Sequence, residues 1–227
     1  MLKKFNKEYL KFLFPQRTRL MTEYGIANES GDSEVVEAVN AMTNKDYEMI
    51  KNFLPDNINS LLDIGCGLAL IDFALYNHYN QKVNLFLLDK TNEISKEDNI
   101  KGFNQKYIFY NSMSATAETL IENGVSESNL NIFEVSDENL ELLNNKKFDL
   151  ILSLLSCGWH YSIETYIDLI LNSLEDDGLL IIDIRHNTGQ LEYLVQRMQM
   201  VHHIINKNES KHTGGTIGDR YFFKKIK

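Results

Sequence analysis

The sequence predicts a doubly wound α/β fold, because short and nearly continuous apolar runs alternate with longer polar or amphipathic stretches. Such runs fit the strands of a mostly parallel sheet that is covered on both faces. The stretches between them are long enough for the helices that connect parallel strands. The expected strands lie at 61–64, 83–88, 131–135, 148–155 and 179–184.

The two ends of the chain depart from this alternation. Apolar residues at three- and four-residue spacing predict a helix over 33–54 that ends before Pro55. A helix near 189–199 precedes two apolar runs, which indicate a closing hairpin. Residues 1–30 are expected to form a short N-terminal helical cap or lid, and residues 31–227 one compact domain, since no linker or repeat divides them.

Composition narrows the classes of partner. The chain has 227 residues, with 23 Lys and Arg against 32 Asp and Glu, a net charge of -9 and a pI near 5.2. This balance argues against nucleic acid and anionic membrane surfaces as partners. No apolar run approaches the roughly 18 residues of a membrane span, and the start lacks a secretion signal, so a cytoplasmic protein is expected. Reduced thiols are expected for Cys66 and Cys157.

A glycine turn follows the first expected strand, with Asp63 before it and Gly65 and Gly67 within it. Glycine lets the backbone approach a ligand closely, and the start of the next helix offers unpaired N–H groups. Asp89 stands 22 positions beyond Gly67, at the end of the second strand, where a carboxylate can accept both hydroxyls of a ribose. The pattern favours a nucleoside-containing ligand, with ordinary turn punctuation as the alternative. Leu70 stands where the dinucleotide fingerprint has its third glycine, which disfavours NAD.

Taken in order, residues 62–67, Asp89, 148–153 and 174–181 resemble the class I S-adenosylmethionine-dependent methyltransferases, over residues 60 to about 185. The resemblance implies a Rossmann-like, seven-stranded sheet with an antiparallel last strand, and S-adenosylmethionine as cofactor. It also implies that the glycine turn surrounds the methionine part, that Asp89 holds the ribose and that Ser136 and Asp137 lie against the adenine. The residues expected to bind the cofactor are Asp63, Gly65, Cys66, Gly67, Asp89, Lys90, Ser136, Asp137 and Ser153.

The methyl acceptor is expected beyond the carboxyl ends of the fourth and fifth strands, where ligands of open α/β sheets bind. His160 is the candidate catalytic residue there, because an imidazole with a pKa near neutrality can take a proton from an acceptor hydroxyl. A histidine that caps the next helix is the alternative. Trp159 and Tyr161 are candidate walls of the acceptor pocket, or else core residues.

An arginine pair near the start suggests an anionic acceptor. Pro15 favours an extended chain before it, and in an extended segment Arg17 and Arg19 point the same way and could hold one anion, together with Arg185. Two solvated surface arginines are the alternative. These features are weakly similar to small bacterial O-methyltransferases of capsule or surface-polysaccharide pathways, whose acceptors include sugar and phosphoramidate groups.

Oxygen is the expected acceptor atom, because the Asn-Pro-Pro-Tyr sequence of amino methylases is missing after the fourth strand. Metal assistance is not indicated, and His202, His203 and His212 are expected to be structural or exposed because no carboxylate or cysteine stands at ligand spacing. Two further readings stay open: a cofactor-binding subunit or regulator that transfers nothing, and an RNA or protein methyltransferase. An NAD dehydrogenase comes last.

Overall fold

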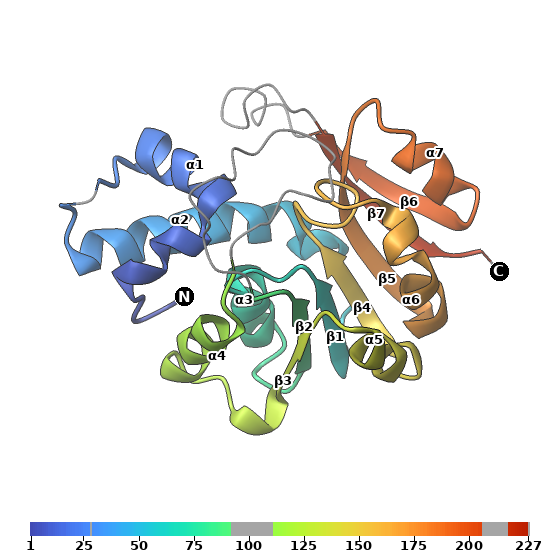
Figure 1. Ribbon diagram of the computed structural model, residues 1–227, viewed down its shortest axis with the longest axis horizontal. Coiled ribbons are helices and arrows are strands. Elements are labelled where there is room, and N and C mark those ends of the chain that lie inside the picture. Colours follow the sequence, from blue (N-terminus) through green and yellow to red (C-terminus); the bar gives the residue numbers. More distant parts are fainter. Residues whose placement is uncertain (28, 92–110, 206–217, 227) are drawn as a thin grey trace.

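A computed structural model describes residues 1–27, 29–91, 111–205 and 218–226, except for the side chains of 14–18. Seven strands form one sheet in the order β3-β2-β1-β4-β5-β7-β6 (Figure 1). Strands β1 to β5 pair in parallel, whereas β7 is antiparallel to both of its neighbours. The strands are β1 (Ser60–Ile64), β2 (Asn84–Asp89), β3 (Leu130–Glu134), β4 (Phe148–Ser153), β5 (Leu174–Arg185), β6 (Met198–Ile204) and β7 (Gly218–Lys225).

Helices cover both faces of the sheet, as the apolar runs predicted. Helices α2, α3 and α4 pack on one face, and α5, α6 and α7 on the other (Figure 1). Alternate strand residues feed the two cores: Leu61 belongs to the first and Leu62 to the second, and both are fully buried. The α-helices are α1 (Phe14–Tyr24), α2 (Asp32–Ile50), α3 (Leu70–His78), α4 (Met113–Glu122), α5 (Asp137–Asn144), α6 (Ile167–Ser173) and α7 (Gln190–Val195). Short 3-10 helices are η1 (Lys7–Phe12), η2 (Lys51–Phe53), η3 (Glu127–Asn129) and η4 (Ile163–Thr165).

The predicted strands and the closing hairpin are confirmed, although β4 ends at Ser153 and β5 begins at Leu174, and one helix boundary is wrong. The helix expected to run to 199 ends at Val195, and Met198 already begins β6. Met198 is buried and pairs with Lys225 of β7, so tertiary pairing overrides the helical pattern of the local sequence. The glycines of the predicted hairpin turn at 214 and 215 lie outside the described residues, as does His212.

The N-terminal segment is helical and tied to the domain. Its apolar side chains Leu2, Phe5, Leu13 and Leu20 are buried in the core on the α2 face. Asn123, at the end of α4, accepts hydrogen bonds from the main chain of Lys3 and Lys4 at 2.7 and 3.0 Å.

The extended conformation expected around Arg17 and Arg19 is wrong, because both residues lie in α1. Pro15 stands in the first turn of that helix, where its fixed φ fits and its missing N–H is not needed. Residues two apart on a helix point in different directions, so this segment cannot converge both guanidinium groups on one anion.

In the described part of the chain, no helix is both long enough and apolar enough to cross a bilayer.

A buried ion pair joins β5 to β7. Arg220 is 2% exposed, and its guanidinium donates to both carboxylate oxygens of the fully buried Asp183 at 2.8 and 2.9 Å. Two parallel N–H···O bonds fix the orientation of the guanidinium. A third nitrogen, Nη1, points to the carboxylate of Asp46 on α2, 3.9 Å away.

We expect Arg220→Met to lower the free energy of unfolding by about 3–5 kcal/mol, because it leaves Asp183 charged and buried. Lys225→Met on the same strand serves as the matched control, since the partner of Lys225 is the exposed Asp176. That control should stay within about 1 kcal/mol of the parent.

The double variant Asp183→Leu/Arg220→Met should recover most of the loss, because apolar residues of similar volume replace a buried pair well. Denaturant unfolding measures all three variants. A single variant as stable as the parent would show that the pair contributes nothing.

Candidate functional site

The turn after β1 has the left-handed backbone that its glycines allow. Gly65 has φ +84° and Gly67 has φ +55°, and Ala69, with φ +54°, precedes the first residue of α3. The N–H of Gly65 donates to the carbonyl of Leu88 in β2 at 2.7 Å. The turn is therefore fixed against the end of the neighbouring strand.

Asp89 ends β2 and holds the same turn from the side. Its Oδ2 accepts from the N–H of Gly67 at 2.7 Å, and its Oδ1 accepts from the N–H of Lys90 at 2.7 Å. Burial raises the pKa of Asp89, and these hydrogen bonds act in the opposite direction. Carboxylate oxygens have more acceptor capacity than these bonds use, so Asp89 can still accept hydroxyl donors.

Asn111, which the sequence analysis missed, lines the cavity and contacts the turn. Its amide nitrogen donates to the carbonyl of Gly67 at 3.0 Å and to Asp89 Oδ2 at 3.1 Å. Thr116 of α4 also donates to the Gly67 carbonyl, at 2.8 Å. Neither residue comes directly after an expected strand, so the rule that places ligand-binding residues at strand ends could not predict them.

Gly65 lies against the loop that follows β4. A Cβ at position 65 would sit 1.8 Å from Ser156 Oγ, so any side chain there collides with that loop. Around Gly67, by contrast, no described atom lies within 4 Å of a Cβ position. The turn is thus closed on the side of Gly65 and open at Gly67, which leaves backbone accessible to a ligand.

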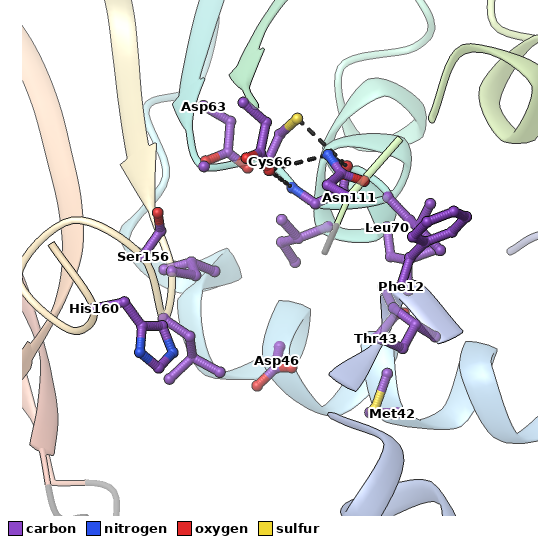
Figure 2. Close-up of a pocket in the computed structure, with 18 of the residues that line it drawn as sticks. Phe12, Met42, Thr43, Asp46, Asp63, Cys66, Leu70, Asn111, Ser156 and His160 are labelled. Carbon is purple, nitrogen blue, oxygen red and sulfur yellow. Dashed lines mark hydrogen bonds between the residues drawn. The ribbon is translucent and has the colours of Figure 1, made fainter. Parts of the chain in front are cut away.

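A cavity opens between this turn, the loop after β4 and helix α2 (Figure 2). The empty space within it is about 1050 Å³ when the open solvent at its mouth is included. Its polar lining consists of Thr43, Asp46, Asp63, Asp89, Asn111, Ser156, His160, Tyr161 and Arg220, together with the turn. The apolar lining includes Phe12, Met42, Leu70 and Leu154.

His160 lines the cavity, as predicted, but not with the expected pKa. Burial, with a smaller contribution from the charge of Arg185, lowers the pKa of His160 to about 3. Its imidazole is therefore neutral around pH 7. The helix-capping alternative does not apply, because Ser162 caps η4 and the N–H of His160 donates to the carbonyl of Ser156 at 2.7 Å.

Of the other residues expected near the acceptor, Tyr161 lines the cavity and Trp159 does not. Trp159 is 2% exposed and packs against Gly218 of β7, so it belongs to the core. Arg185 ends β5, outside the cavity lining, and its N–H donates to the carbonyl of Gly158 at 3.0 Å.

Of the two arginines of the cap, Arg19 does not line the cavity. The side chain of Arg17 lies outside the described residues. Arg19 contacts Glu23 at 3.4 Å and Asp46 at 3.5 Å, so its charge is already met by two carboxylates. Among the described residues on this side, Asp46 presents its carboxylate to the cavity.

Asp46 and Arg220, which the sequence analysis also missed, form the wall opposite the glycine turn. Figure 2 shows Asp46 on α2, facing the side of the cavity that carries Asp63 and Cys66. Burial raises the pKa of Asp46, while Arg220 and Arg19 oppose that shift. Charges alternate from Asp183 through Arg220 and Asp46 to Arg19, and they connect the sheet to α2 and α1.

Four of the residues expected to bind the cofactor do not line the cavity. Ser153 is fully buried, and its hydroxyl donates to the carbonyl of Ile64 at 2.7 Å, which joins β4 to β1. The side chain of Lys90 is exposed. Ser136 and Asp137 are exposed at the start of α5, where the Ser136 hydroxyl accepts from the N–H of Asn139.

Both cysteines are buried free thiols, as expected. Burial raises the pKa of Cys157 to about 12 and that of Cys66 well above its usual value, so both stay protonated. Cys66 lines the cavity between the two glycines.

Two histidines near β7, at the side of the sheet formed by β7 and β6, share the carboxylate of Asp219 as a partner. Their spacing in the sequence did not predict this contact. His203 and His186 each place Nε2 2.9 Å from the same oxygen of Asp219. His202 stacks on Phe53, with ring centroids 3.9 Å apart. Within the described ranges, no group of three histidine, cysteine or acidic residues has the geometry to hold a metal ion.

Comparison with solved structures identifies the architecture. The chain superposes on an O-methyltransferase segment, "StiE O-MT residues 961-1257", with a TM-score of 0.59 and 12% identity, covering 91% of this chain and 81% of that one. It superposes on a coclaurine N-methyltransferase bound to N-methylheliamine and SAH with a TM-score of 0.53 and 13% identity, over 97% and 79% of the two chains. The chain has the Rossmann-like methyltransferase fold.

A third structure with this fold is a putative S-adenosylmethionine-dependent methyltransferase from Listeria monocytogenes, with a TM-score of 0.50 and 12% identity, over 82% of this chain and 100% of that one. No protein-family model and no curated protein sequence matches the chain. The three similar structures include an O- and an N-methyltransferase, so the fold leaves the acceptor atom open.

We expect the ring resonances of His160 to stay constant between pH 5 and 8, since a pKa of about 3 keeps the imidazole neutral throughout. Heteronuclear NMR follows the ring C–H signals, which are assigned by their loss in His160→Gln. Free imidazole in the same tube provides the titrating control. A midpoint near 6.5 for His160 would show that its ring exchanges readily with water.

Proposed function

We propose that this protein transfers a methyl group from S-adenosylmethionine to an oxygen atom of a small-molecule acceptor. The observation that supports it best is the glycine turn fixed to Asp89 at one side of a cavity whose other walls carry His160, Tyr161 and Asp46. The fold shared with the methyltransferase structures supports methyl transfer from this cofactor, whereas the choice of oxygen comes from the sequence.

The donors and acceptors present fit this cofactor. Asp89 is held by Gly67 and Asn111 with acceptor capacity to spare, which suits the two hydroxyls of a ribose. Asp63 borders the cavity beside Gly65 with a carboxyl group suited to an ammonium ion. The open backbone at Gly67 leaves room for close approach.

In this proposal the bound cofactor supplies an electrophilic sulfonium methyl group. The protein's own contribution is alignment, because holding an acceptor oxygen in line with such a group can lower the barrier by several kcal/mol, up to about 7–11 in ideal cases. The residues that we assign to the acceptor are His160, Tyr161 and Asp46. A neutral His160 ring can accept a hydrogen bond from an acceptor hydroxyl and take its proton as the methyl group transfers.

The acceptor is not restricted to an anion in this proposal. That expectation, with the phosphoryl, phosphoramidate or sugar-derived acceptors of a capsule pathway, depended on Arg17 and Arg19 converging, and α1 prevents it. Arg220 does line the cavity, but its guanidinium is already paired with Asp183. Oxygen stays the proposed acceptor atom because the amino-methylase sequence is missing after β4.

The test uses methyl-labelled S-adenosylmethionine with a deproteinised small-molecule extract of the producing organism. We expect label in one small product, formed by the parent protein and more slowly, by about 10²-fold, by His160→Gln. Cofactor binding without any labelled product would support the alternative of a non-catalytic binding subunit. Label transferred instead to RNA or protein from that organism would identify a macromolecular acceptor.

Replacing Asp89 should weaken the cofactor site selectively. We expect Asp89→Asn to raise the Kd for S-adenosylhomocysteine about tenfold or more in calorimetry, because charge-assisted hydrogen bonds to the ribose are lost.

The matched control is Asp149→Asn. Asp149 also accepts two main-chain N–H groups, those of Asn59 and Ser60, but at the opposite edge of the sheet. The control should bind like the parent. Equal Kd values for Asp89→Asn and the parent would contradict the assignment of Asp89.

A further inference from the structure

Two carboxyl groups lie in contact beneath the glycine turn. Asp63, in β1, and Asp72, in the first turn of α3, are within hydrogen-bonding distance of each other. They are 2% and 0% exposed. Only Asp63 reaches the cavity lining (Figure 2), so Asp72 stands behind it, away from any ligand.

Among the described residues, the main-chain N–H of Asp72 favours ionisation of its own carboxyl group, but burial outweighs it. In the described segments, no other residue donates a hydrogen bond to either oxygen of Asp72 or to Oδ1 of Asp63. Of the residues that the structure describes, the titratable groups that act on the pair are the carboxylate of Asp89 on β2 and the thiol of Cys66 in the turn, and neither is a cation. The start of α3 favours a negative charge on Asp72 only weakly.

Two ionised carboxylates that lie in contact and buried, without a cation beside them, are strongly unfavourable. A neutral acid that donates a hydrogen bond to an ionised neighbour resolves the conflict with a single proton. Burial raises the pKa of Asp72 to about 7 and that of Asp63 well above its usual value, in agreement with this arrangement. The cavity is the side from which a cation can approach Asp63.

We propose that Asp63 and Asp72 share one proton in the free protein, and that the α-ammonium group of the cofactor's amino-acid part binds at Asp63 and drives this proton into solvent. Asp72 is then a positioning residue, which controls the charge of Asp63 without touching the ligand. The step conserves atoms: the carboxylic acid loses H⁺ to the buffer, and the ammonium group keeps its three protons. The inference rests on the proposed cofactor and adds the proton coupling of its site.

The sign of the pH dependence follows from linkage. An ammonium group stabilises the ionised pair and so lowers its pKa in the complex. Binding therefore releases protons, and affinity rises with pH over the range in which the free pair still holds the proton that the complex has lost. For the free protein the sign is opposite: a raised acid pKa makes the folded state lose stability as pH rises from about 4 to about 7.

Calorimetry tests the proposal at pH 6, where an α-amino group, with a pKa near 8, stays protonated. S-adenosylhomocysteine is titrated into the protein in two buffers of different ionisation enthalpy. We expect a buffer-dependent heat that corresponds to net proton release. 5′-Methylthioadenosine lacks the amino-acid group and should bind without that component.

Asp72→Asn separates the proposed role from a merely structural one, because an amide donates to Asp63 as the protonated acid does but cannot lose a proton. This variant should bind S-adenosylhomocysteine within about threefold of the parent at pH 6, with no proton release. Asp63→Asn should lose about tenfold or more in affinity. The melting temperature of ligand-free Asp72→Asn should fall less than that of the parent between pH 5 and 7.

Binding of S-adenosylhomocysteine without proton release in the parent would overturn the inference and leave the proposed function standing. Proton release that persists in Asp72→Asn would also overturn it, because another group would then be the source. If neither S-adenosylmethionine nor S-adenosylhomocysteine bound, the proposed function would fail together with the inference.

Discussion

The hydrogen bond from the N–H of Gly67 to the carboxylate of Asp89 connects the ends of the first two strands, and the geometry of the site depends on it. Together with the bond from Gly65 to the carbonyl of Leu88, it fixes a turn of left-handed residues. It also orients the carboxylate, which the amide of Asn111 holds from the other side. The turn after β1, the end of β2 and the segment before α4 that carries the amide thus meet at one carboxylate. The hydrogen-bond acceptors for a ligand at this edge of the sheet are therefore held in position before it binds.

The sheet was predictable because its signal is local. Buried parallel strands must be apolar along most of their length, and the turn after β1 carries glycines at the positions where the backbone has positive φ. Asp89 was predictable because its signal is also local: an acid at the end of the second strand of such a sheet is placed to bind a ribose. His160 and Tyr161 could be placed at the cavity from their position after β4.

Residues whose role depends on tertiary contacts were not predictable. Asp46 lies near the C-terminal end of α2, and its sequence context is that of a solvated helix acid, but the packing of α2 places it at the cavity. Arg220 looks like a surface residue of a terminal strand, yet it is 2% exposed because β7 inserts between β5 and β6. The protonation of His160 was misjudged because burial, the main cause of its lowered pKa, cannot be read from a short motif. The conformation of Arg17 and Arg19 was not predictable from Pro15, because proline is common in the first turn of a helix as well as in extended segments.

The contact between Gly65 and Ser156 restricts how such a chain can evolve. The turn after β1 and the loop after β4 are separated by 91 positions, yet a methyl group on residue 65 would sit 1.8 Å from the hydroxyl of Ser156. A larger residue at 65 therefore requires a glycine at 156 and a rebuilt backbone turn as well. Two simultaneous changes are rare. Among descendants of this sequence, residues 65 and 156 should therefore change together or stay the same, while the residues on the acceptor side of the cavity vary.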